Sequence, residues 1–525
     1  APMEASKLSS LLSRLGPKAK AIAKATPVAS GVQAGGTRTV SGNTVTQDKV
    51  VRREFRLAEG DPFNSFQVKR SSDRIQSLGY FQEKLEIEQK PGSAPDRIVL
   101  EANVEEKATG ELQLSAGFSS LERFIINFSI RQRNFRGKGQ ELRAGVNYSQ
   151  YSKSIELGFT EPYFLDKNIA LGADVFRRDL NSFNFINQSR QTTYEQQTTG
   201  IQLRMGVPIT EFWSFAARYG LSYDDVTLDA STYYFNGQCD PYLAGRYLCD
   251  AIGKRTTSSV GYSLVYDTLD NRIRPTRGNR ILFSQDFAGL GGSVKYLRTN
   301  AEARQYWRPF GNFVFSASTE GGFIKSFEKS RGEGLDKARL TDRYFLGEPQ
   351  FPGFDIRGIG PRVQRQFYDN AGNLITARDQ VVDDSLGGRA YYLSRLELEI
   401  PLGSGAREMG LRPSIFAVAG SVFGVTNPIA NNLPNGLRRC RDDATGAVTE
   451  QTLNIACSTG QSVLFEVPPF KEVFLGDTWR PRVSVGFGVN WRSPFGPFRI
   501  DIAKALVKYD GDDPKLFTFN VGTQF

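Results

Sequence analysis

The stretch WRSPFGPFRIDIA, residues 491–503, indicates the fold class of this chain. Large apolar residues occupy every second position from Phe498 to Ile502, and Arg499 and Asp501 fall between them. A period of two is that of a β-strand with one apolar and one polar face. The connection Ser493–Pro497 contains proline and glycine, which favour a turn. The stretch therefore predicts the end of one strand, a short turn and a second strand.

This alternation continues over most of the chain. In RLELEI, residues 395–400, leucine and isoleucine alternate with Arg395, Glu397 and Glu399. Charged residues on one face and aliphatic residues on the other predict a polar lumen and a lipid-facing exterior. A soluble sandwich also alternates, but a long unbroken series of strands argues against it. From Glu111 onward, sixteen candidate strands begin near residues 112, 125, 139, 154, 168, 197, 212, 256, 279, 297, 312, 388, 412, 482, 497 and 516.

We therefore predict a mainly β protein with a 16-stranded antiparallel transmembrane β-barrel over residues 108–525. An even strand number brings both ends of the barrel to the periplasmic side. The predicted connections support this, because short turns alternate with long loops in outer-membrane barrels. Even-numbered connections are mostly short: Arg136–Gly139, Pro162–Lys167, Val207–Thr210, Pro309–Asn312 and Ser493–Pro497. Several odd-numbered, outward connections are long: Ser182–Gln196, Asp225–Arg255, Lys325–Gly387 and Gly424–Arg480.

Composition agrees with a barrel and not with membrane helices. Mean hydropathy is −0.37, and no run approaches the roughly 18 apolar residues that a transmembrane helix needs. A transmembrane strand turns only alternate residues to lipid, so its hydropathy signal is weak. The 52 glycines and the aromatic content of 12% fit strands with aromatic girdles. The net charge is +10, but the sequence shows no dense basic helix and no RNA-binding motif. We therefore predict that the basic residues face anionic lipid headgroups rather than nucleic acid.

Two residue types narrow the function further. The chain has no histidine, which excludes Ser-His-Asp and Cys-His nucleophiles and any His-ligated metal site. Its four cysteines form two close pairs, Cys239 with Cys249 and Cys440 with Cys457, in the fourth and seventh outward connections. Close pairing predicts two local disulfides and an oxidising compartment, and the alternative is four free thiols. We predict no enzyme activity, no cofactor and no metal.

Two segments precede the predicted barrel. Residues 1–36 are basic and nearly free of acidic residues, and we assign them no function. Because the chain begins with Ala and shows no recognisable signal peptide, we expect a mature or truncated chain. Residues 37–107 predict a small α/β domain in the order strand, helix, helix, strand, strand. Thr46 and Asn64 are the predicted caps of its helices, and alternating apolar residues from Ile98 to Val104 form its last strand.

With these features together, the chain resembles the BamA family of outer-membrane protein assembly factors, in which POTRA domains precede a surface-antigen barrel. Residues 37–107 resemble a periplasmic POTRA domain in SGNTVTQDKVVRREF (41–55) and QSLGYF (76–81). Only one POTRA domain is recognisable, where the family has several. The barrel resembles the family in FTEPYFLD (159–166), DTLDNRIRPTRGNRI (267–281), IRGIGPR (356–362), WRSPFGPFRIDIA (491–503) and the terminal FTFNVGTQF (517–525). Each motif is weak alone, but they occur together and in the family's order.

The resemblance implies a lateral seam between the first strand, Glu111–Ser119, and the last strand, Lys515–Phe525. A client strand would pair with the opened edge and the new barrel would grow by β-augmentation. An open edge in hydrocarbon has unsatisfied backbone groups and must find strand partners. The last strand also resembles a β-signal, although an ordinary lipid-facing strand has much of the same pattern. The predicted seam residues are Leu112, Leu114, Gly117, Phe517, Phe519, Gly522 and Phe525.

The sixth outward connection departs from the family pattern. The family has Val-Arg-Gly-Phe there, and its arginine pairs in the lumen with acidic groups of the wall. Here the aligned residues read FPGF (351–354), one predicted wall partner is Glu397, and the other acidic position holds Val418. Arg357 is a candidate replacement partner for Glu397; the alternative is an exposed Arg357 and a loop held by glycine turns and packing. The predicted loop motif residues are Pro352, Gly353, Phe354, Arg357, Gly358 and Gly360.

The resemblance also implies a location and partners. We expect an integral protein of the outer membrane of a Gram-negative bacterium, with the POTRA domain in the periplasm. The expected partners are unfolded outer-membrane barrel proteins, outer-membrane lipids, accessory lipoproteins of the assembly complex and periplasmic chaperones. The alternatives are a TamA-like or two-partner-secretion exporter, an organelle outer-membrane sorting subunit, a passive porin and a membrane-embedded hydrolase. A porin does not explain the POTRA domain, and no hydrolase motif that dispenses with histidine is present.

Overall fold

The computed structural model describes residues 38–82, 85–92, 97–119, 122–186, 189–272, 274–403, 410–493 and 496–521. The chain divides into two compact units. One contains the residues up to Gly110 together with Arg133–Gln140, and the other contains Glu111–Gln132 and Glu141–Phe525. The segment 1–36, treated separately in the sequence, lies outside the described residues. No helix among the described residues has both the length and the apolar character needed to cross a membrane.

The smaller unit is a three-stranded sheet with two helices, in the predicted order. In the sheet, β1 runs parallel to β3, and β2 runs antiparallel to β3 on its other side. Val50, Ile75 and Ala102 are fully buried in a core shared by the helices and the sheet. The elements are β1 (Arg38–Ser41), α3 (Asp48–Arg52), α4 (Ser65–Ser77), β2 (Glu86–Pro91) and β3 (Ile98–Asn103).

The two predicted helix caps differ in outcome. Asn64 caps α4 as predicted, because its side chain accepts hydrogen bonds from the backbone amides of Phe66 and Gln67. The prediction that Thr46 caps the first helix was wrong. That helix, α3, follows Gln47 without a side-chain cap, and the Thr46 hydroxyl instead accepts a hydrogen bond from the Asn134 amide at 2.8 Å. The Thr46 hydroxyl, which the local sequence predicted as the cap of α3, is therefore used in a tertiary hydrogen bond within this unit.

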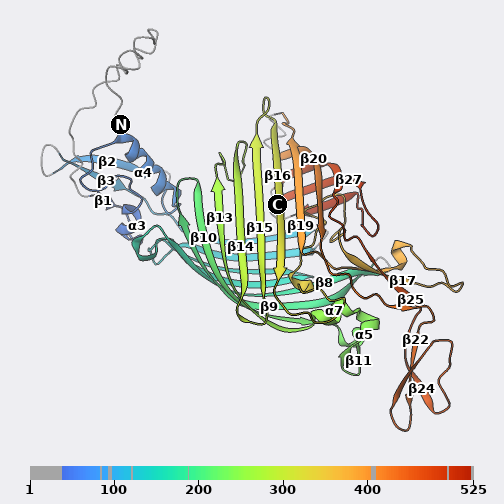
Figure 1. Cartoon of the computed structure of the whole chain (residues 1–525). Coiled ribbons are helices and arrows are strands. Elements are labelled where there is room, and N and C mark those ends of the chain that lie inside the picture. Colours follow the sequence, from blue (N-terminus) through green and yellow to red (C-terminus); the bar gives the residue numbers. More distant parts are fainter. Residues whose placement is uncertain are drawn as a thin grey trace, which may run out of the picture. The chain divides into compact units, whose positions relative to one another are not determined.

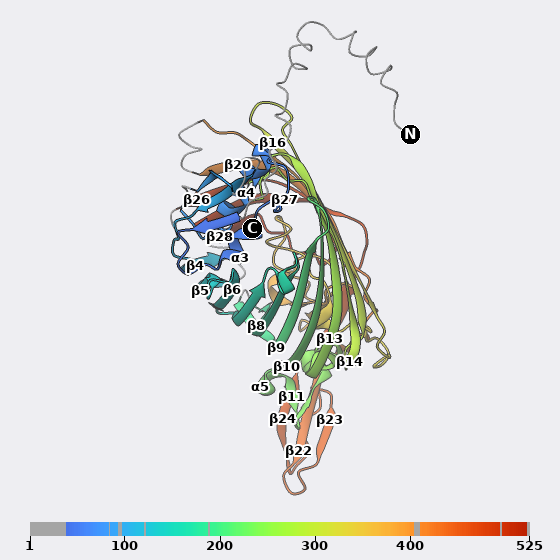
Figure 2. The same cartoon turned by 90° about the vertical axis from the view of Figure 1, so that its left-hand side faces the viewer.

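The larger unit is a closed antiparallel barrel of sixteen strands, which confirms the predicted fold class (Figures 1 and 2). Closure pairs every strand on both sides, as backbone groups in hydrocarbon require. Most strands begin within two residues of their predicted starts. The strands are β4 (Gly110–Ser119), β5 (Arg123–Phe135), β6 (Gln140–Ser149), β7 (Ser152–Glu161), β8 (Ala170–Ile186), β9 (Ser189–Pro208), β10 (Trp213–Thr227), β13 (Gly253–Asp267), β14 (Gly278–Gly292), β15 (Tyr296–Trp307), β16 (Val314–Ser326), β19 (Ala390–Glu399), β20 (Leu411–Phe423), β26 (Arg482–Ser493), β27 (Gly496–Val507) and β28 (Phe517–Val521).

One predicted connection is wrong: Ser182–Gln196 is not a long loop. β8 and β9 pair from Ala170 opposite Gly206 to Ile186 opposite Ser189. β9 has 20 residues, which at roughly 3.3 Å per residue is about twice the ~30 Å thickness of the hydrocarbon core. The outer part of this hairpin therefore stands in water, where pairing persists without the apolar alternation that marks a membrane strand.

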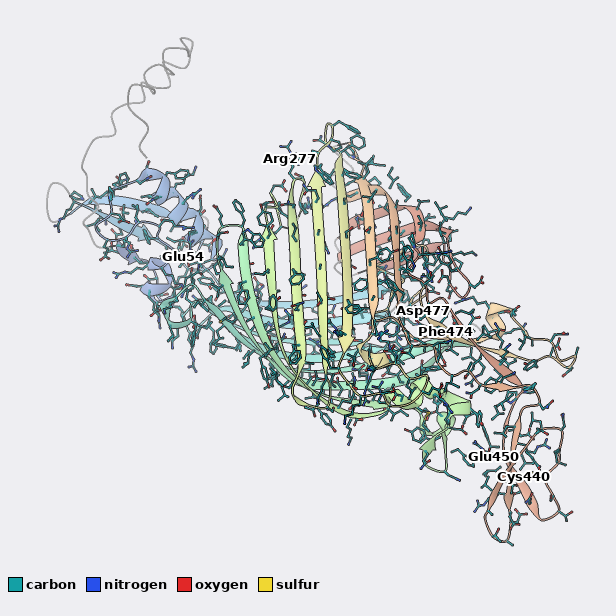
Figure 3. All side chains as sticks on the ribbon, in the orientation of Figure 1. Glu54, Arg277, Cys440, Glu450, Phe474 and Asp477 are labelled. Carbon is teal, nitrogen blue, oxygen red and sulfur yellow. A yellow bond between two sulfur atoms is a disulfide. The ribbon has the colours of Figure 1, made fainter. Side chains whose placement is uncertain are left out.

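The other three long outward connections are present, and we call them loops 4 (228–252), 6 (327–389) and 7 (424–481). Loop 7 carries a three-stranded sheet that stands apart from the barrel strands in both views (Figures 1 and 2). Figure 3 marks Cys440 and Glu450 on this sheet. The loop elements are α5 (Ala230–Tyr233), β11 (Tyr234–Phe235), β12 (Gln238–Cys239), α6 (Pro241–Ala244), α7 (Arg246–Ala251), β17 (Arg362–Phe367), β18 (Val382–Ser385), β21 (Asn432–Leu433), β22 (Leu437–Asp442), β23 (Val448–Gln451), β24 (Gln461–Val467) and β25 (Phe470–Leu475).

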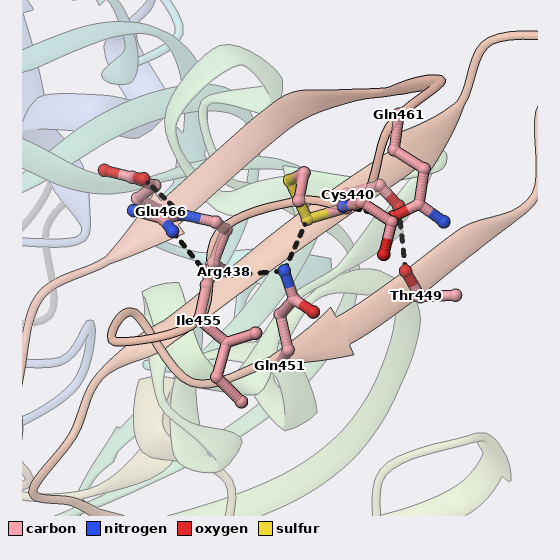
Figure 4. Close-up of a disulfide and its surroundings, with 9 residues drawn as sticks. Arg438, Cys440, Thr449, Gln451, Ile455, Gln461 and Glu466 are labelled. Carbon is pink, nitrogen blue, oxygen red and sulfur yellow. Dashed lines mark hydrogen bonds and ion pairs between the residues drawn. A yellow bond between two sulfur atoms is a disulfide. The ribbon is translucent and has the colours of Figure 1, made fainter.

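Both predicted disulfides are present, Cys239–Cys249 in loop 4 and Cys440–Cys457 in loop 7. Around the second, the Gln451 amide donates a hydrogen bond to the Cys440 sulfur at 3.0 Å (Figure 4). The two loops also contact each other, because the guanidinium of Arg439 forms a buried ion pair with Asp240. Each partner of this pair neighbours a disulfide cysteine in the sequence, so the ion pair joins the two bridged segments.

Candidate functional site

The first and last barrel strands, β4 and β28, are neighbours and close the barrel (Figure 2). Within the described residues they share two Cα pairs, Ser119 with Asn520 and Phe118 with Val521. These pairs lie at the outward end of β4, where the strand runs into the first outward connection. This junction is the seam that the sequence predicts, and we use that name for it below.

Side chains alternate along β28 as a membrane strand requires. Phe517 is 52% exposed, whereas Thr518 and Asn520 are buried. On β4, Leu112 and Leu114 are each 69% exposed. Both strands therefore present apolar side chains outward, and β28 turns polar side chains inward.

The other predicted seam residues are placed as follows. Phe519 lies edge-to-face on the Phe498 ring of the neighbouring strand β27, with centroids 5.6 Å apart. Gly117 is half-buried in β4. Gly522 and Phe525 lie outside the described residues. The role of these residues in a seam that opens stays a prediction.

The FPGF segment of loop 6, which we call the loop 6 tip (351–354), docks on the inner wall through apolar contacts. Phe351 and Phe354 are fully buried, and their rings meet edge to face at 5.0 Å. They belong to one buried cluster with Phe416 and Val418 of β20 and Ala503 of β27. Val418 occupies the position where the resemblance places a wall carboxylate. The tip is therefore held here by packing at the place where the family pattern has an ion pair.

Two glycines allow this close approach. Gly353 has φ +103°, and a Cβ there would lie 2.7 Å from the Cβ of Ser484. Gly360 has φ +100°, and its Cβ would meet a methyl group of Val422 at 2.3 Å. A hydrogen bond of 2.6 Å from the Ser484 hydroxyl to the carbonyl of Pro352 completes the dock. A side chain at either glycine would push the loop off the wall.

The proposed pairing of Arg357 with Glu397 was wrong. Glu397 accepts hydrogen bonds from Arg395 at 2.9 Å and from the Ser414 hydroxyl at 2.5 Å, and Arg499 lies 3.6 Å away. Two wall arginines thus compensate a carboxylate that would otherwise be costly to bury. The sequence alternation puts Arg395 and Glu397 on one face of a strand, and this pattern could have identified Arg395 as a partner of Glu397. It does not give the register between strands that brings Arg499 to the same place.

Arg357 instead holds loop 6 to β8. It donates a hydrogen bond to the Ser182 hydroxyl at 2.6 Å, and its guanidinium lies over the Phe345 ring at 4.6 Å. It has φ +53°, and the neighbouring Gly358 leaves no room for a Cβ beside the carbonyl of Asp355. Arg357, Ser182 and Phe345 line a cavity of about 620 Å³ between loop 6 and the wall. The alternative of a solvent-exposed Arg357 is therefore also wrong, because Arg357 is partly buried and contacts Ser182 and Phe345.

A family model of the Omp85 superfamily domain matches residues 134–525. The chain belongs to the Omp85 superfamily. A second model, the surface antigen variable number repeat of POTRA domains, matches residues 38–107. Together the two matches cover the POTRA domain and the barrel that the resemblance to the BamA family implied.

Individual Omp85 relatives agree with this assignment. The chain is 29% identical over 487 residues to an outer membrane protein assembly factor BamA of Neorickettsia risticii, covering 93% of this chain and 54% of the relative. It spans about half the length of the curated relatives that it matches. Among solved structures, BamA from Haemophilus ducreyi lacking POTRA domains 1–3 is similar with a TM-score of 0.65 at 22% identity, over 93% of this chain and 84% of that one. CdiB from Acinetobacter baumannii has a TM-score of 0.51 at 9% identity, over 93% of this chain and 74% of that one. These two likenesses concern the fold.

The chemistry available at the Omp85 seam is strand pairing. The described residues contain no group of three or more Cys, Asp or Glu side chains arranged to hold a metal ion. What the site offers is the junction between the first and last strands, an apolar exterior next to it and a lumen wall on which Glu397 is paired with arginines. Such an arrangement suits recognition of another strand.

Proposed function

We propose that this Omp85 protein folds other β-barrels and inserts them into the outer membrane through the seam between β4 and β28. The chain is an outer-membrane protein with its POTRA domain in the periplasm. Relatives named outer membrane protein assembly factor BamA, which match 93% of the chain, support the assembly role. The observation that carries the seam is the β4–β28 junction, with two Cα pairs at its outward end within the described residues.

In this mechanism an unfolded client strand pairs with β4 from the periplasmic side. The strand edge over Gly110–Gly117 supplies backbone donors and acceptors, and pairing satisfies the client's own backbone groups as it enters hydrocarbon. The exposed side chains of Leu112 and Leu114 extend the lipid-facing surface to the new strand. Each added strand then becomes the edge for the next one. The barrier to insertion falls because no unpaired edge is left in lipid.

The proposed partners follow from this mechanism. Clients are unfolded outer-membrane barrel proteins delivered by periplasmic chaperones, and lipids surround the seam. Accessory lipoproteins of an assembly complex would bind on the periplasmic side. No covalent bond is made or broken in this mechanism, so it needs neither a catalytic residue nor a cofactor.

The test is a folding assay in liposomes. The full chain is reconstituted, an unfolded barrel protein is added, and client folding is followed by heat-modifiable gel mobility. We expect faster client folding than in empty liposomes, with a full-length BamA relative as the positive control. An unchanged rate beside an active control would contradict the proposal. Entry of an unfolded polypeptide into the liposome interior would support the exporter alternative, and steady solute flux would support a porin.

A further inference from the structure

Loop 6 is paired with the segment that leads into the last strand. We call residues 512–516 the β28 lead-in. Phe354 of the loop 6 tip forms an antiparallel bridge with Pro514 of the lead-in. Bonds between main-chain atoms on either side of this bridge make it a short piece of β-pairing. They run from the Asp355 amide to the Asp513 carbonyl (2.8 Å), from the Asp513 amide to the Gly358 carbonyl (2.7 Å) and from the Lys515 amide to the Gly353 carbonyl (3.0 Å).

Lys515 adds a charged contact to this pairing. Its ammonium lies 2.6 Å from a carboxylate oxygen of Glu348 and 3.1 Å from one of Asp355. The Glu348 side chain is 1% exposed, so its charge depends on protein partners rather than on water. Burial lowers the pKa of Lys515, but the two carboxylates outweigh burial and the pKa is raised overall. The ammonium therefore stays charged at neutral pH.

The beginning of the lead-in is fixed to the barrel wall. Arg482 of β26 contacts both carboxylate oxygens of Asp512, at 3.0 and 3.1 Å, and both side chains are fully buried. Arg378 of loop 6 donates a hydrogen bond to the Gly511 carbonyl at 3.0 Å. The lead-in is thus held by the wall at Asp512 and by loop 6 at Lys515.

The far end of the lead-in reaches the seam. β28 begins at Phe517, two residues after Lys515. Asn520 of the same strand then pairs with Ser119 of β4. Leu516, at a bend, is the single residue between Lys515 and β28, so little chain is available to absorb a displacement of Lys515. The position of Lys515 therefore bears directly on where β28 meets β4.

We infer that Lys515 is a positioning residue for the seam. Its contact with Glu348 and Asp355 holds loop 6 against the β28 lead-in and keeps the outward end of β28 in register with β4. If the loop 6 tip left the wall, this contact would pull β28 away from its position beside β4. Loop 6 and the seam are then two parts of one mechanism. The inference rests on the seam of the proposed function, but its test does not require insertion activity.

The experiment measures seam register in the full chain by a disulfide across it. Ser119→Cys and Asn520→Cys place thiols at paired positions, and all four natural cysteines are already in disulfides. We expect Lys515→Met to slow formation of the new disulfide by about tenfold, because it removes one partner of a buried ion pair. Lys515→Arg should restore the rate. The matched control is Lys508→Met, since Lys508 is exposed and takes part in no ion pair of the described structure.

A second variant keeps the test valid if Lys515→Met fails to fold, as judged by heat-modifiable mobility. Glu348→Gln should slow the cross-link in the same direction, and the double variant should be no slower than the slower single variant, because both changes remove one contact. An unchanged cross-linking rate in a folded Lys515→Met or Glu348→Gln barrel overturns the inference. Equal slowing by Lys508→Met also overturns it. If the rates respond as expected while the parent chain fails to fold clients in liposomes, the inference stands and the proposed function fails.

Discussion

The β8–β9 hairpin and the seam are two junctions of one barrel, and the pairing within the described residues is much longer at the hairpin. β8 and β9 pair from Ala170 to Ile186 with one register shift between Ser182 and Phe183, over strands of 17 and 20 residues. At the seam, β4 has 10 residues, and the described part of β28 has 5. The two Cα pairs known for the seam lie at its outward end. Strand separation in lipid exposes backbone groups in proportion to the length left unpaired within the membrane, and the hairpin ladder also continues into water beyond that length.

The difference extends to the structures around each junction. Loops 4, 6 and 7 interlock through Arg439–Asp240 and through a hydrogen bond from the Tyr247 hydroxyl to Asp384. Near the seam, the loop 6 tip pairs with the β28 lead-in. If the barrel opens as proposed, we expect it to do so at the seam and not where the outward loops are joined to one another.

The largest expected effect comes from locking the seam. An oxidised Ser119→Cys/Asn520→Cys barrel should lose at least about tenfold of its client-folding rate in liposomes, because no strand can then enter between β4 and β28. The matched control is Ala216→Cys/Ser263→Cys, a register pair between β10 and β13. Equal loss in both oxidised variants would mean that the seam is not special.

Removing the apolar dock should come next. Phe354→Ala empties a fully buried site and should lower the free energy of unfolding by about 3–5 kcal/mol. The measurement is the temperature at which heat-modifiable mobility is lost, together with the rate of the seam cross-link. A faster or unchanged cross-link beside a lower transition temperature would separate loop 6 from the seam and weaken the comparison.

Restoring a wall acid tests the same dock by charge. Val418→Asp buries a carboxylate in an apolar cluster, opposite Arg395 whose guanidinium already pairs with Glu397, and should destabilise the barrel by about 2–4 kcal/mol. Pro352→Arg combined with it should recover part of that loss, because the guanidinium would enter at the family position. Additive damage in the double variant, measured by the same thermal transition, would show that the tip cannot revert to an ionic lock.

The contact between Tyr247 and Asp384 should respond to pH. Burial raises the pKa of Asp384 to about 6, above the ordinary value of 3.8. A raised carboxyl pKa means that the folded state binds the proton more tightly, so this contribution favours folding at low pH and is lost as pH rises through 6. The protection factor of the α7 amides, which is the exchange rate corrected for the intrinsic rate at each pH, should therefore be higher at pH 5 than at pH 7.5, by about tenfold or less. Asp384→Asn should remove the difference, and the seam cross-link should not follow it.

Among the substitutions tested by thermal unfolding, the smallest effect is expected for Arg357→Ala. Arg357 contributes one hydrogen bond to Ser182 and a stacking contact with Phe345, worth about 1–2 kcal/mol together. It does not touch the network around Glu397. A thermal shift as large as that of Phe354→Ala would mean that loop 6 depends on the β8 side of the barrel as much as on its apolar dock.

The sequence predicts the barrel well and its loops less well, for identifiable reasons. Alternation such as that of RLELEI depends on which face meets lipid, and this local signal placed the strands. The β8–β9 hairpin was missed because its outer residues meet water on both faces. Arg395 was visible as a neighbour of Glu397 on one strand face. Arg499, Val418 and Lys515 reach their partners through register and loop path, which no periodicity encodes.

The two disulfides have a further consequence for how the barrel works. Each closes a short stretch, 10 and 17 residues in separation, inside a single outward loop. The four cysteines are all the cysteines in the chain, so no covalent link crosses between β4 and β28. The disulfides can therefore cross-link loops 4 and 7 without preventing β4 and β28 from separating. Reductant should loosen the outward loops 4 and 7 while leaving the opening of the seam between β4 and β28 unchanged.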